Sequence, residues 1–442
     1  MPGWLGYIAI VDSPSTPAAT RNPWLWVPSL YFAQALPNVL VVTVSVYAYT
    51  RLGVTAETIG YTAWLSLPWM LKPLWSPIVE LFSTERRWTW AMQYLAAASL
   101  AVVAMGYRSE HFLLWTVVGY GVLAFASATH DIAADGYYMR ALSAHDQTWF
   151  AGLRNVFFRV GVIFGEGVLL TVAGLLMRNK FDPGLAWALT HGLTAVVLCL
   201  LATYHLLVLP DLPPKVRRAD ASVAGVLNET WSIFQKFFAS IPLKVAIPFL
   251  LFYRFAEAQL AKFAGKFLID PRADGGLGLL EEQVGWINGF FGIGALLAGG
   301  VLGGLVAARY GLRRCLLWMA VLINVPNIIY VALAYYQPES LTMIGLGVVI
   351  EKFGYGFGFT GFMLYLLYIA QGEYRTSFYA IGTGFMTLGL IFPQSLAGSL
   401  LQWMNYREFF VWIMFATVPS FLVAMLVYRG IDPRFGVKES PG

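Results

Sequence analysis

Thirteen ionisable side chains lie within stretches of the sequence that are otherwise apolar. The basic ones are Lys72, Arg154, Arg159, Arg254, Lys262, Lys266 and Lys352, and the acids are Glu80, Asp131, Asp135, Glu166, Glu257 and Glu351. If these stretches cross a lipid bilayer, each charge at the bilayer centre costs at least about 2.5–3.5 kcal/mol. Such groups usually face one another or a water-filled cavity, and they mark the path of a solute or an ion.

Three of the acids are candidates for proton coupling. Glu257 and Glu351 lie near the middle of their apolar stretches, and Asp131 shares a helical face with Asp135, four residues later. A carboxyl group removed from water holds a proton more readily, whereas one beside an arginine stays ionised and holds helices together. Glu257 follows Arg254 by three residues and shares its face. The sequence leaves both roles open for Glu257.

A second set of charges lies close to the ends of the apolar stretches. It comprises Asp135, Lys72 and Glu80, together with Arg309 in the loop after a later stretch. Charges at these depths bridge neighbouring helices more readily than they contact a solute at the bilayer centre. We therefore expect this set to act as a gate or as a tether between helices.

A third set forms the candidate substrate site, namely Arg254, Arg159, Lys262, Glu351 and Tyr355. Arg254, Lys262 and Lys266 recur at spacings of eight and four, which places them on one helical face. Lys266 is explained by its position at the membrane surface, where lysine extends its ammonium group to water. A basic stripe facing a cavity would attract an anionic solute. Tyr355 belongs to a stretch of alternating glycines and aromatics, 353–359, that suits stacking on a sugar ring or contact with lipid.

Composition indicates that the chain is a membrane protein. Its 442 residues are 58% hydrophobic and only 12% charged, whereas soluble domains carry about 25% charged residues. The net charge of +5 fits cytoplasmic Lys and Arg and predicts no nucleic-acid partner. The two cysteines and five histidines form no metal or disulfide pattern, and no catalytic or phosphate-binding motif is present. We expect no cofactor, no metal and no enzymatic activity.

Apolar runs between charged or Pro/Gly breaks predict an all-α protein with twelve transmembrane helices. The expected spans are 24–50, 56–82, 88–107, 112–140, 148–177, 185–209, 243–268, 283–307, 315–336, 341–370, 376–402 and 407–428. Two six-helix bundles, 24–209 and 243–428, would then be joined by a cytoplasmic linker, 210–242. The segments 1–23 and 429–442 would form the cytoplasmic N-terminal segment and tail.

The distribution of basic residues predicts the orientation. With both termini cytoplasmic, 16 Lys and Arg residues fall on the inner side and 6 on the outer side, as the positive-inside rule requires. Within the linker, Val223, Val226, Leu227, Trp231, Phe234, Phe237, Phe238 and Ile241 recur at helical spacing. We therefore expect an amphipathic helix there, lying on the cytoplasmic surface of the bilayer.

A loop motif resembles that of the major facilitator superfamily. Gly304-x-x-x-Ala308-Arg309-Tyr310-Gly311-Leu312-Arg313-Arg314 is similar to its pattern G-x-x-x-D-R/K-x-G-R-R, with alanine in the acidic position. At the equivalent place in the first half, Glu80 keeps the acid but the glycines are missing. This resemblance implies the major facilitator fold, in which two bundles surround a cavity at the membrane midplane.

Further stretches resemble the AmpG muropeptide permease family. They are 31–37 (YFAQALP), 72–77 (KPLWSP), 128–135 (ATHDIAAD), 159–161 (RVG), 253–257 (YRFAE), and Glu351 with the glycine run after it. The resemblance covers nearly the whole chain and implies proton-driven import of anhydro-muropeptides across the bacterial inner membrane. His130, Glu80 and Glu257 depart from the residues usual in that family, and Glu166 is an additional acid.

The sequence thus predicts a proton-coupled secondary transporter that imports muropeptide-like solutes by alternating access. We expect it to be a monomer that contacts the bilayer, a small-molecule substrate and protons. Another anionic or amphiphilic cargo, such as a CoA ester, a sugar, a drug or a lipid-linked compound, is the first alternative. A membrane-embedded acyltransferase is a remote alternative, because no catalytic His or Ser stands out.

Overall fold

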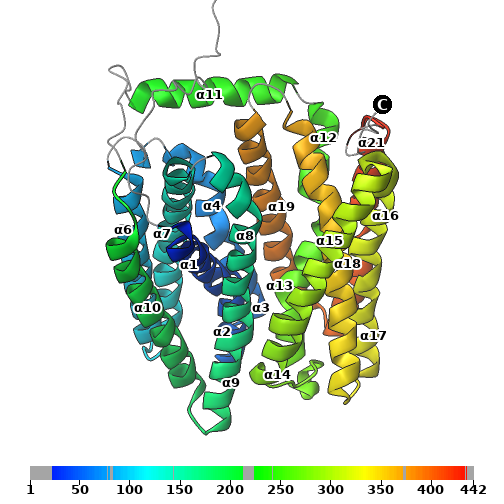
Figure 1. Ribbon diagram of the computed structural model, residues 1–442. Helices are drawn as coiled ribbons and strands as arrows, with labels where there is room; N and C mark the ends of the chain where they lie inside the picture. The colour runs from blue at the N-terminus through cyan, green and yellow to red at the C-terminus, as the bar shows by residue number, and fades with distance from the viewer. Residues whose placement is uncertain are drawn as a thin grey trace, which may run out of the picture.

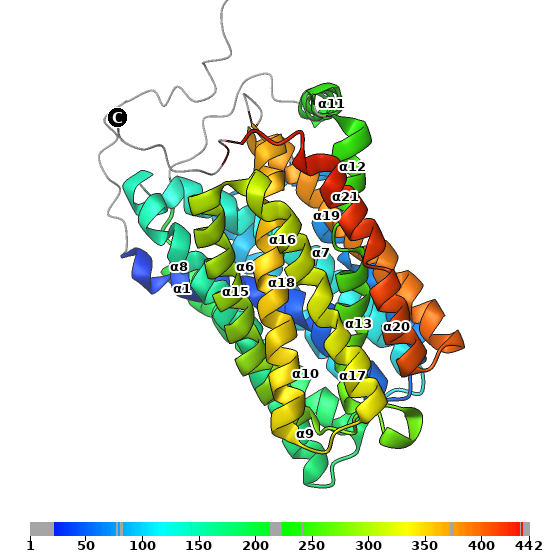
Figure 2. The ribbon, with the colours of Figure 1, turned by 90° about the vertical axis from the view of Figure 1, so that its right-hand side faces the viewer.

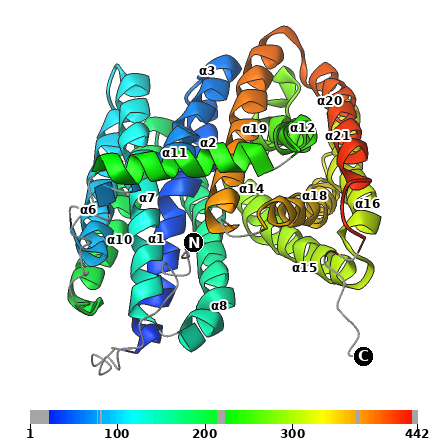
Figure 3. The same ribbon diagram turned by 90° about the horizontal axis from the view of Figure 1, so that it is seen from above.

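A computed structural model of the chain describes residues 22–76, 78–79, 83–142, 144–212, 223–240, 242–371, 375–433 and 435. In these residues the structure consists of helices and their connections, without strands (Figure 1). Most helices run nearly parallel to one another, and the helix α11 (Val223–Ser240) lies across one end of the bundle. Figure 3 shows α11 extending over helices of both halves of the chain.

The first half begins with a broken helix made of η2 (Pro23–Leu25), α1 (Val27–Val39), the π-helical turn η3 (Leu40–Val44) and α2 (Ser45–Arg51). A second broken segment follows as α3 (Ala56–Tyr61), η4 (Thr62–Ser66), α4 (Leu67–Leu71) and η5 (Lys72–Leu74). The next segments are α6 (Glu85–Gly106), α7 (Phe112–Ala141), the α8–η6–α9 run (Ala144–Ile163, Phe164–Leu169 and Leu170–Arg178) and α10 (Pro183–Val208).

The second half repeats the pattern of long, locally broken helices. It contains α12 (Leu243–Phe252), α13 (Phe255–Ile269), the short turn η7 (Arg272–Asp274), and the run α14 (Glu281–Val284), η8 (Gly285–Gly292) and α15 (Ile293–Tyr310). It continues with α16 (Leu312–Asn324), η9 (Val325–Asn327), α17 (Ile328–Tyr336), α18 (Leu341–Ile369), α19 (Arg375–Trp403), α20 (Tyr406–Phe415) and α21 (Val418–Tyr428). Figure 2 shows α15, α16, α17 and α18 on the face that this half presents.

Nine of the described helical segments are long and apolar enough to cross a membrane. A tenth candidate arises if Trp231–Ala239 and Lys244–Ile269, which are bent by 106° relative to each other, are taken together as one span. The other two expected spans, 56–82 and 341–370, are also helical where described, as α3–η5 and α18. The first is interrupted near Pro68 and Pro73, because proline lacks a backbone N–H and disrupts a continuous α-helix. The second carries Glu351 and Lys352, which lower its hydropathy. The all-α membrane fold predicted from the sequence is confirmed.

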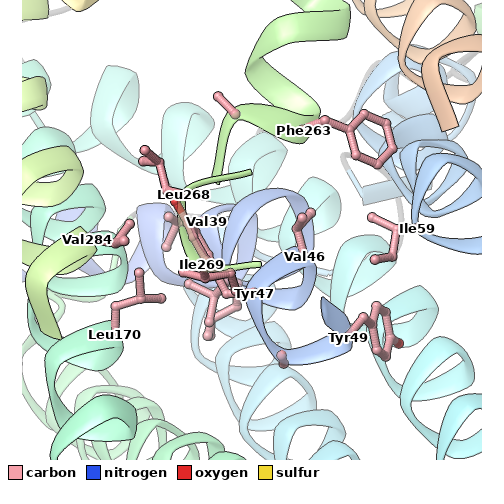
Figure 4. Close-up of a cluster of buried hydrophobic side chains, with 14 of the residues drawn as sticks. Val39, Val46, Tyr47, Tyr49, Ile59, Leu170, Phe263, Leu268, Ile269 and Val284 are labelled. Carbon is pink, nitrogen blue, oxygen red and sulfur yellow. The ribbon is translucent and has the colours of Figure 1, made fainter. Parts of the chain in front are cut away.

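The largest buried apolar cluster of the described residues joins the two halves (Figure 4). It includes residues of α2, α9 and α14, which lie at the end away from α11 in Figure 1. Val39 and Tyr47 from the first helix meet Leu170 from α9, and Phe263 and Val284 come from the second half. At the opposite end, Phe237 of α11 packs against Phe378 of α19, with ring centroids 5.3 Å apart. The halves are therefore sealed together on one side of the bundle, while α11 covers the other side.

Candidate functional site

Arg254 is the centre of a buried polar cluster in the second half. It lies between α12 and α13, where Pro248 and a non-helical conformation at Arg254 interrupt the span. Its Nε and one terminal nitrogen each lie 2.9 Å from Oε2 of Glu257, to which the guanidinium donates. The other contact is a hydrogen bond of 2.8 Å to the hydroxyl of Tyr355. The rings of Phe359 and Tyr355 lie 4.7 and 5.3 Å from the guanidinium carbon, which is cation–π geometry.

Glu351 and Lys352 extend this cluster along α18. Their charged groups are 3.5 Å apart, and both side chains are largely buried. Lys352 also interacts electrostatically with Glu257 and, across the interface between the halves, with Glu166 of η6. Arg159 on α8 interacts with Glu166 and with Tyr355. Pairwise interactions thus link six charged side chains, three of each sign, into one network between the halves.

A separate cluster lies within the first half. Lys72 pairs with Asp131 at 3.7 Å, and Arg154 pairs with Asp135 at the same distance. The hydroxyl of Tyr31 donates to Asp135 at 3.0 Å, which fixes the carboxylate against the first helix. The structure therefore brings together Lys72 and Asp135, which were predicted to act as a gate or tether, with Asp131, a proton-coupling candidate, and adds Arg154 and Tyr31 to them. Glu80 lies outside the described residues.

Arg309 lies apart from these clusters. It is exposed at the end of α15, with its guanidinium 5.6 Å from the ring of Tyr310. Within the described part of the chain it makes no ion pair. Its gating role stays a prediction.

The seam between the halves, at the end away from α11, is closed by direct contacts. Arg51 pairs with Glu281 and donates to the carbonyl of Leu279 at 3.0 Å, and Arg178 pairs with Glu282 at 3.1 Å. Deeper in the seam, Asn288 donates to the hydroxyl of Tyr47 at 3.0 Å. The backbones of η6 and η8 approach each other closely there. A Cβ on Gly289 would lie only 2.5 Å from the Cα of Gly167. Small residues allow this approach.

Lys262 lies in this seam, buried to 4% exposure, and donates to Thr62 of the first half at 2.8 Å. From the sequence we expected Lys262 on a face that would line an outward-facing cavity. In this structure the same face is covered by the first half. Lys266, one turn further along, instead pairs with Asp270 at 2.8 Å.

Two residues of the central cluster received no role from sequence reasoning. Lys352 and Glu166 are ionisable residues in apolar helices, and that property alone was a visible signal. Their proximity was not visible, because they are 186 positions apart on helices of different halves. Among the described residues no group of three or more His, Cys, Asp or Glu side chains is arranged to hold a metal ion.

Comparison with known proteins agrees with this architecture. No protein-family model matches the sequence. The anhydromuropeptide permease of Escherichia coli (strain K12) is 25% identical over 408 residues, covering 90% of this chain and 78% of that protein. AmpG 4 of Rickettsia felis, named as a transporter, is 22% identical over 413 residues, covering 91% of this chain and 96% of that protein.

Solved structures show the same fold. The nucleoside transporter NupG, as a mutant, superposes with a TM-score of 0.69 at 14% identity, covering 92% of this chain and 100% of that one. A bacterial homologue of the lysosomal transporter Spinster, in an inward-facing conformation, gives 0.65 at 13% identity, covering 94% and 98%. The D-xylose–proton symporter gives 0.64 at 12% identity, covering 93% and 98%.

The resemblance to AmpG permeases that the motifs indicated is therefore confirmed over about nine-tenths of the chain. The superpositions confirm the major facilitator fold. Taken together, the fold, the sequence relatives and the buried charges between two helical halves identify a multi-pass membrane transporter that is not an enzyme, similar in sequence to the AmpG permeases.

Proposed function

We propose that this protein imports an anionic glycan–peptide fragment of the muropeptide class together with protons, by alternating access across the bacterial inner membrane. The observation that carries the proposal is the charge-balanced cluster between the halves, with Arg254 held beside two aromatic rings. The name of the Escherichia coli relative supports the substrate class. The excess of basic residues on the α11 side supports an orientation with both termini cytoplasmic.

The substrate site is built around Arg254. A carboxylate of the peptide part binds the guanidinium, and the sugar part stacks on Tyr355 and Phe359, which already flank it. Arg159 approaches Tyr355 from the first half, so the two halves hold the substrate between them. Closure around the substrate then requires contacts from both bundles, as alternating access demands.

Proton coupling follows from competition for Arg254. The substrate carboxylate displaces Glu257, which then lies buried without its partner. A buried charge left without its partner is strongly destabilised. Taking up a proton removes that charge, so substrate and proton bind together. Glu351 and Asp131 are the other candidate carriers, each beside a lysine at 3.5 and 3.7 Å.

The remaining charged contacts act as gates. In the first half, Lys72 and Asp135 tie helices together near the α11 side through their pairs with Asp131 and Arg154. Glu80 and Arg309 lie in the loop stretches of the two halves that resemble the superfamily motif, and they would contribute when that side closes. The domain division at 24–209, 210–242 and 243–428 and the monomeric state are part of the same proposal.

The decisive experiment is uptake of radiolabelled muropeptide into proteoliposomes, with and without an imposed pH gradient. We expect accumulation only with the gradient, and loss of uptake in Arg254→Gln. Arg429→Gln, which removes an exposed arginine after α21, serves as the matched control and should transport normally. Normal transport by Arg254→Gln, or equal competition by a neutral analogue, contradicts the substrate site. Uptake of a CoA ester in place of muropeptide supports the alternative anionic cargo.

A further inference from the structure

The third segment of the second half is broken near its middle. The helix α16 ends at Asn324, η9 spans Val325–Asn327, and α17 begins at Ile328. Pro326 has no backbone N–H, so the carbonyl of Leu322 lacks its helical partner. The broken segment packs along α18, beside which it lies in Figure 2.

Three polar side chains at this break are buried and incompletely hydrogen-bonded. Among the described residues, both polar atoms of the Asn327 amide and the hydroxyl of Tyr330 have no hydrogen-bond partner. Within this part of the chain, Oε2 of Glu351 has only the ammonium group of Lys352, 3.5 Å away. The three side chains are 1%, 0% and 3% exposed. Each such group left unpaired costs about 1–3 kcal/mol. Three such atoms beside a buried carboxylate therefore require a ligand.

The three side chains lie at one level of the bundle. Glu351 shares a helical face with Gly347 and Gly354, which flank it on α18. A Cβ on Gly347 would lie 2.8 Å from Cγ2 of Ile329, and one on Gly354 would lie 2.7 Å from Cγ of Pro326. Glu351 is therefore level with residues 326–330, which include Asn327 and Tyr330. The electrostatic interaction between Tyr330 and Glu351 agrees with this placement.

The polar atoms at this level of the bundle select the ligand. The amide nitrogen of Asn327 and the hydroxyl of Tyr330 donate hydrogen bonds, whereas the amide oxygen of Asn327 and the carboxylate of Glu351 accept them. A metal cation would face the donors, and an anion would face the carboxylate. Water both donates and accepts, and a buried water typically makes about three hydrogen bonds to groups that lack other partners.

We propose that Asn327, Tyr330 and Glu351 enclose bound water molecules, and that this water carries protons to and from Glu351. The second part rests on the proton coupling proposed above. In each transfer, a water O–H bond breaks as an O–H bond forms on Oε2 of Glu351. The next water replaces the lost proton, so the net change is one proton from bulk solvent.

Further buried polar side chains continue from Tyr330 toward the seam between the halves. Tyr330 interacts with Tyr47, whose hydroxyl accepts from the Asn288 amide at 3.0 Å. The amide oxygen of Asn288 is likewise buried and unpaired among the described residues. The charged groups that face Glu351 are Lys352 on its own helix and Glu257 on α13. The water therefore joins the central charge cluster to the interface that opens and closes.

Radiolytic hydroxyl-radical footprinting tests the water pocket without any transport measurement, because radicals formed from bound water label the side chains beside it. Tyr253 is the internal control, since it is as buried as Tyr330 but its hydroxyl donates to the carbonyl of Gly358. We expect Tyr330 to be modified several-fold faster than Tyr253, and this excess to vanish in Asn327→Leu. Equal, slow modification of the two tyrosines overturns the proposal.

The proton route is tested with Tyr330→Phe and Asn327→Leu in proteoliposomes. We expect accumulation driven by a pH gradient to fall several-fold while counterflow exchange and its KM stay unchanged. Tyr336→Phe, on the exposed end of α17, is the matched control. Unchanged accumulation in both variants shows that the water is not the proton route. If the wild-type protein shows no gradient-driven uptake, the proposed function and the proton role of the water fail together. Footprinting still tests whether bound water lies beside Tyr330.

Discussion

Lys262 offers the sharpest test of how the two halves change partners. Its ammonium group is buried in the sealed seam and donates to the hydroxyl oxygen of Thr62 at 2.8 Å. Thr62 donates its own proton to the carbonyl of Ile59 at 2.6 Å, so its oxygen is free to accept. No carboxylate among the described residues lies within ion-pair distance of Lys262.

The free energy of this arrangement favours opening of the seam. Removing an ammonium group from water costs several kcal/mol in proteins, whereas one hydrogen bond to a charged group returns about 1.5–3 kcal/mol. The sealed state therefore carries a net penalty that disappears when water reaches Lys262. Lys262→Met keeps the length of the side chain and removes the charge. If Lys262→Met stabilises the sealed state by about 1.4 kcal/mol, which is a conservative share of the penalty, the open population falls about tenfold.

Pulsed electron–electron resonance measures this population directly. Spin labels replace Glu110, between α6 and α7, and Glu339, between α17 and α18, after substitution of Cys199 and Cys315. We expect Lys262→Met to deplete the long-distance, open population, and Lys262→Arg to retain it. Thr62→Val removes the acceptor and should shift the equilibrium the opposite way. An open population that rises in Lys262→Met, or shifts in the same direction in both variants, refutes the reasoning.

Three further predictions concern orientation, coupling and sealing. Single cysteines at Ser109 and Gly275 should react with an impermeant reagent from outside and one at Ala221 should not; the reverse pattern contradicts the orientation. Glu257→Gln should abolish gradient-driven accumulation and spare counterflow exchange. If both Glu257→Gln and Glu351→Gln accumulate substrate like the wild type, neither acid carries the proton. Gly289→Leu should weaken sealing, because overpacking costs about 1–3 kcal/mol, whereas Gly294→Leu, where a Cβ meets open space, should leave spin-label distances unchanged.

Much of the architecture could be predicted from the sequence, because membrane helices follow directly from apolar length. The same is true of contacts within one helix. Arg254 and Glu257 were expected on a shared face from their spacing of three, and they lie 2.9 Å apart. Asp131 and Asp135, four apart, likewise belong to one cluster, although each takes a different basic partner.

Contacts between helices of different halves could not be predicted. The sequence gives the approximate depth of Glu166, Lys352 and Lys262, but depth does not determine which face of another helix lies opposite. The answer also depends on conformation: Lys262 would line an open outer cavity in one state and lies buried against Thr62 in the sealed state. The break at Pro326 was visible as a proline in an apolar run, but the unpaired amide of Asn327 beside Glu351 required the packing of two helices.

The balance of charges between the halves determines how any single variant must be interpreted. Removing one partner of a buried pair leaves the other charge unpaired, which costs about 3–5 kcal/mol, whereas replacing both partners is often close to neutral. Loss of transport in Arg254→Gln or Glu257→Gln alone therefore combines a structural penalty with a functional one. The double variant removes the structural penalty and still lacks both the substrate contact and the proton carrier. A double variant that folds stably but does not accumulate substrate thus separates the structural role of this pair from its functional role, because stability then returns while coupling does not.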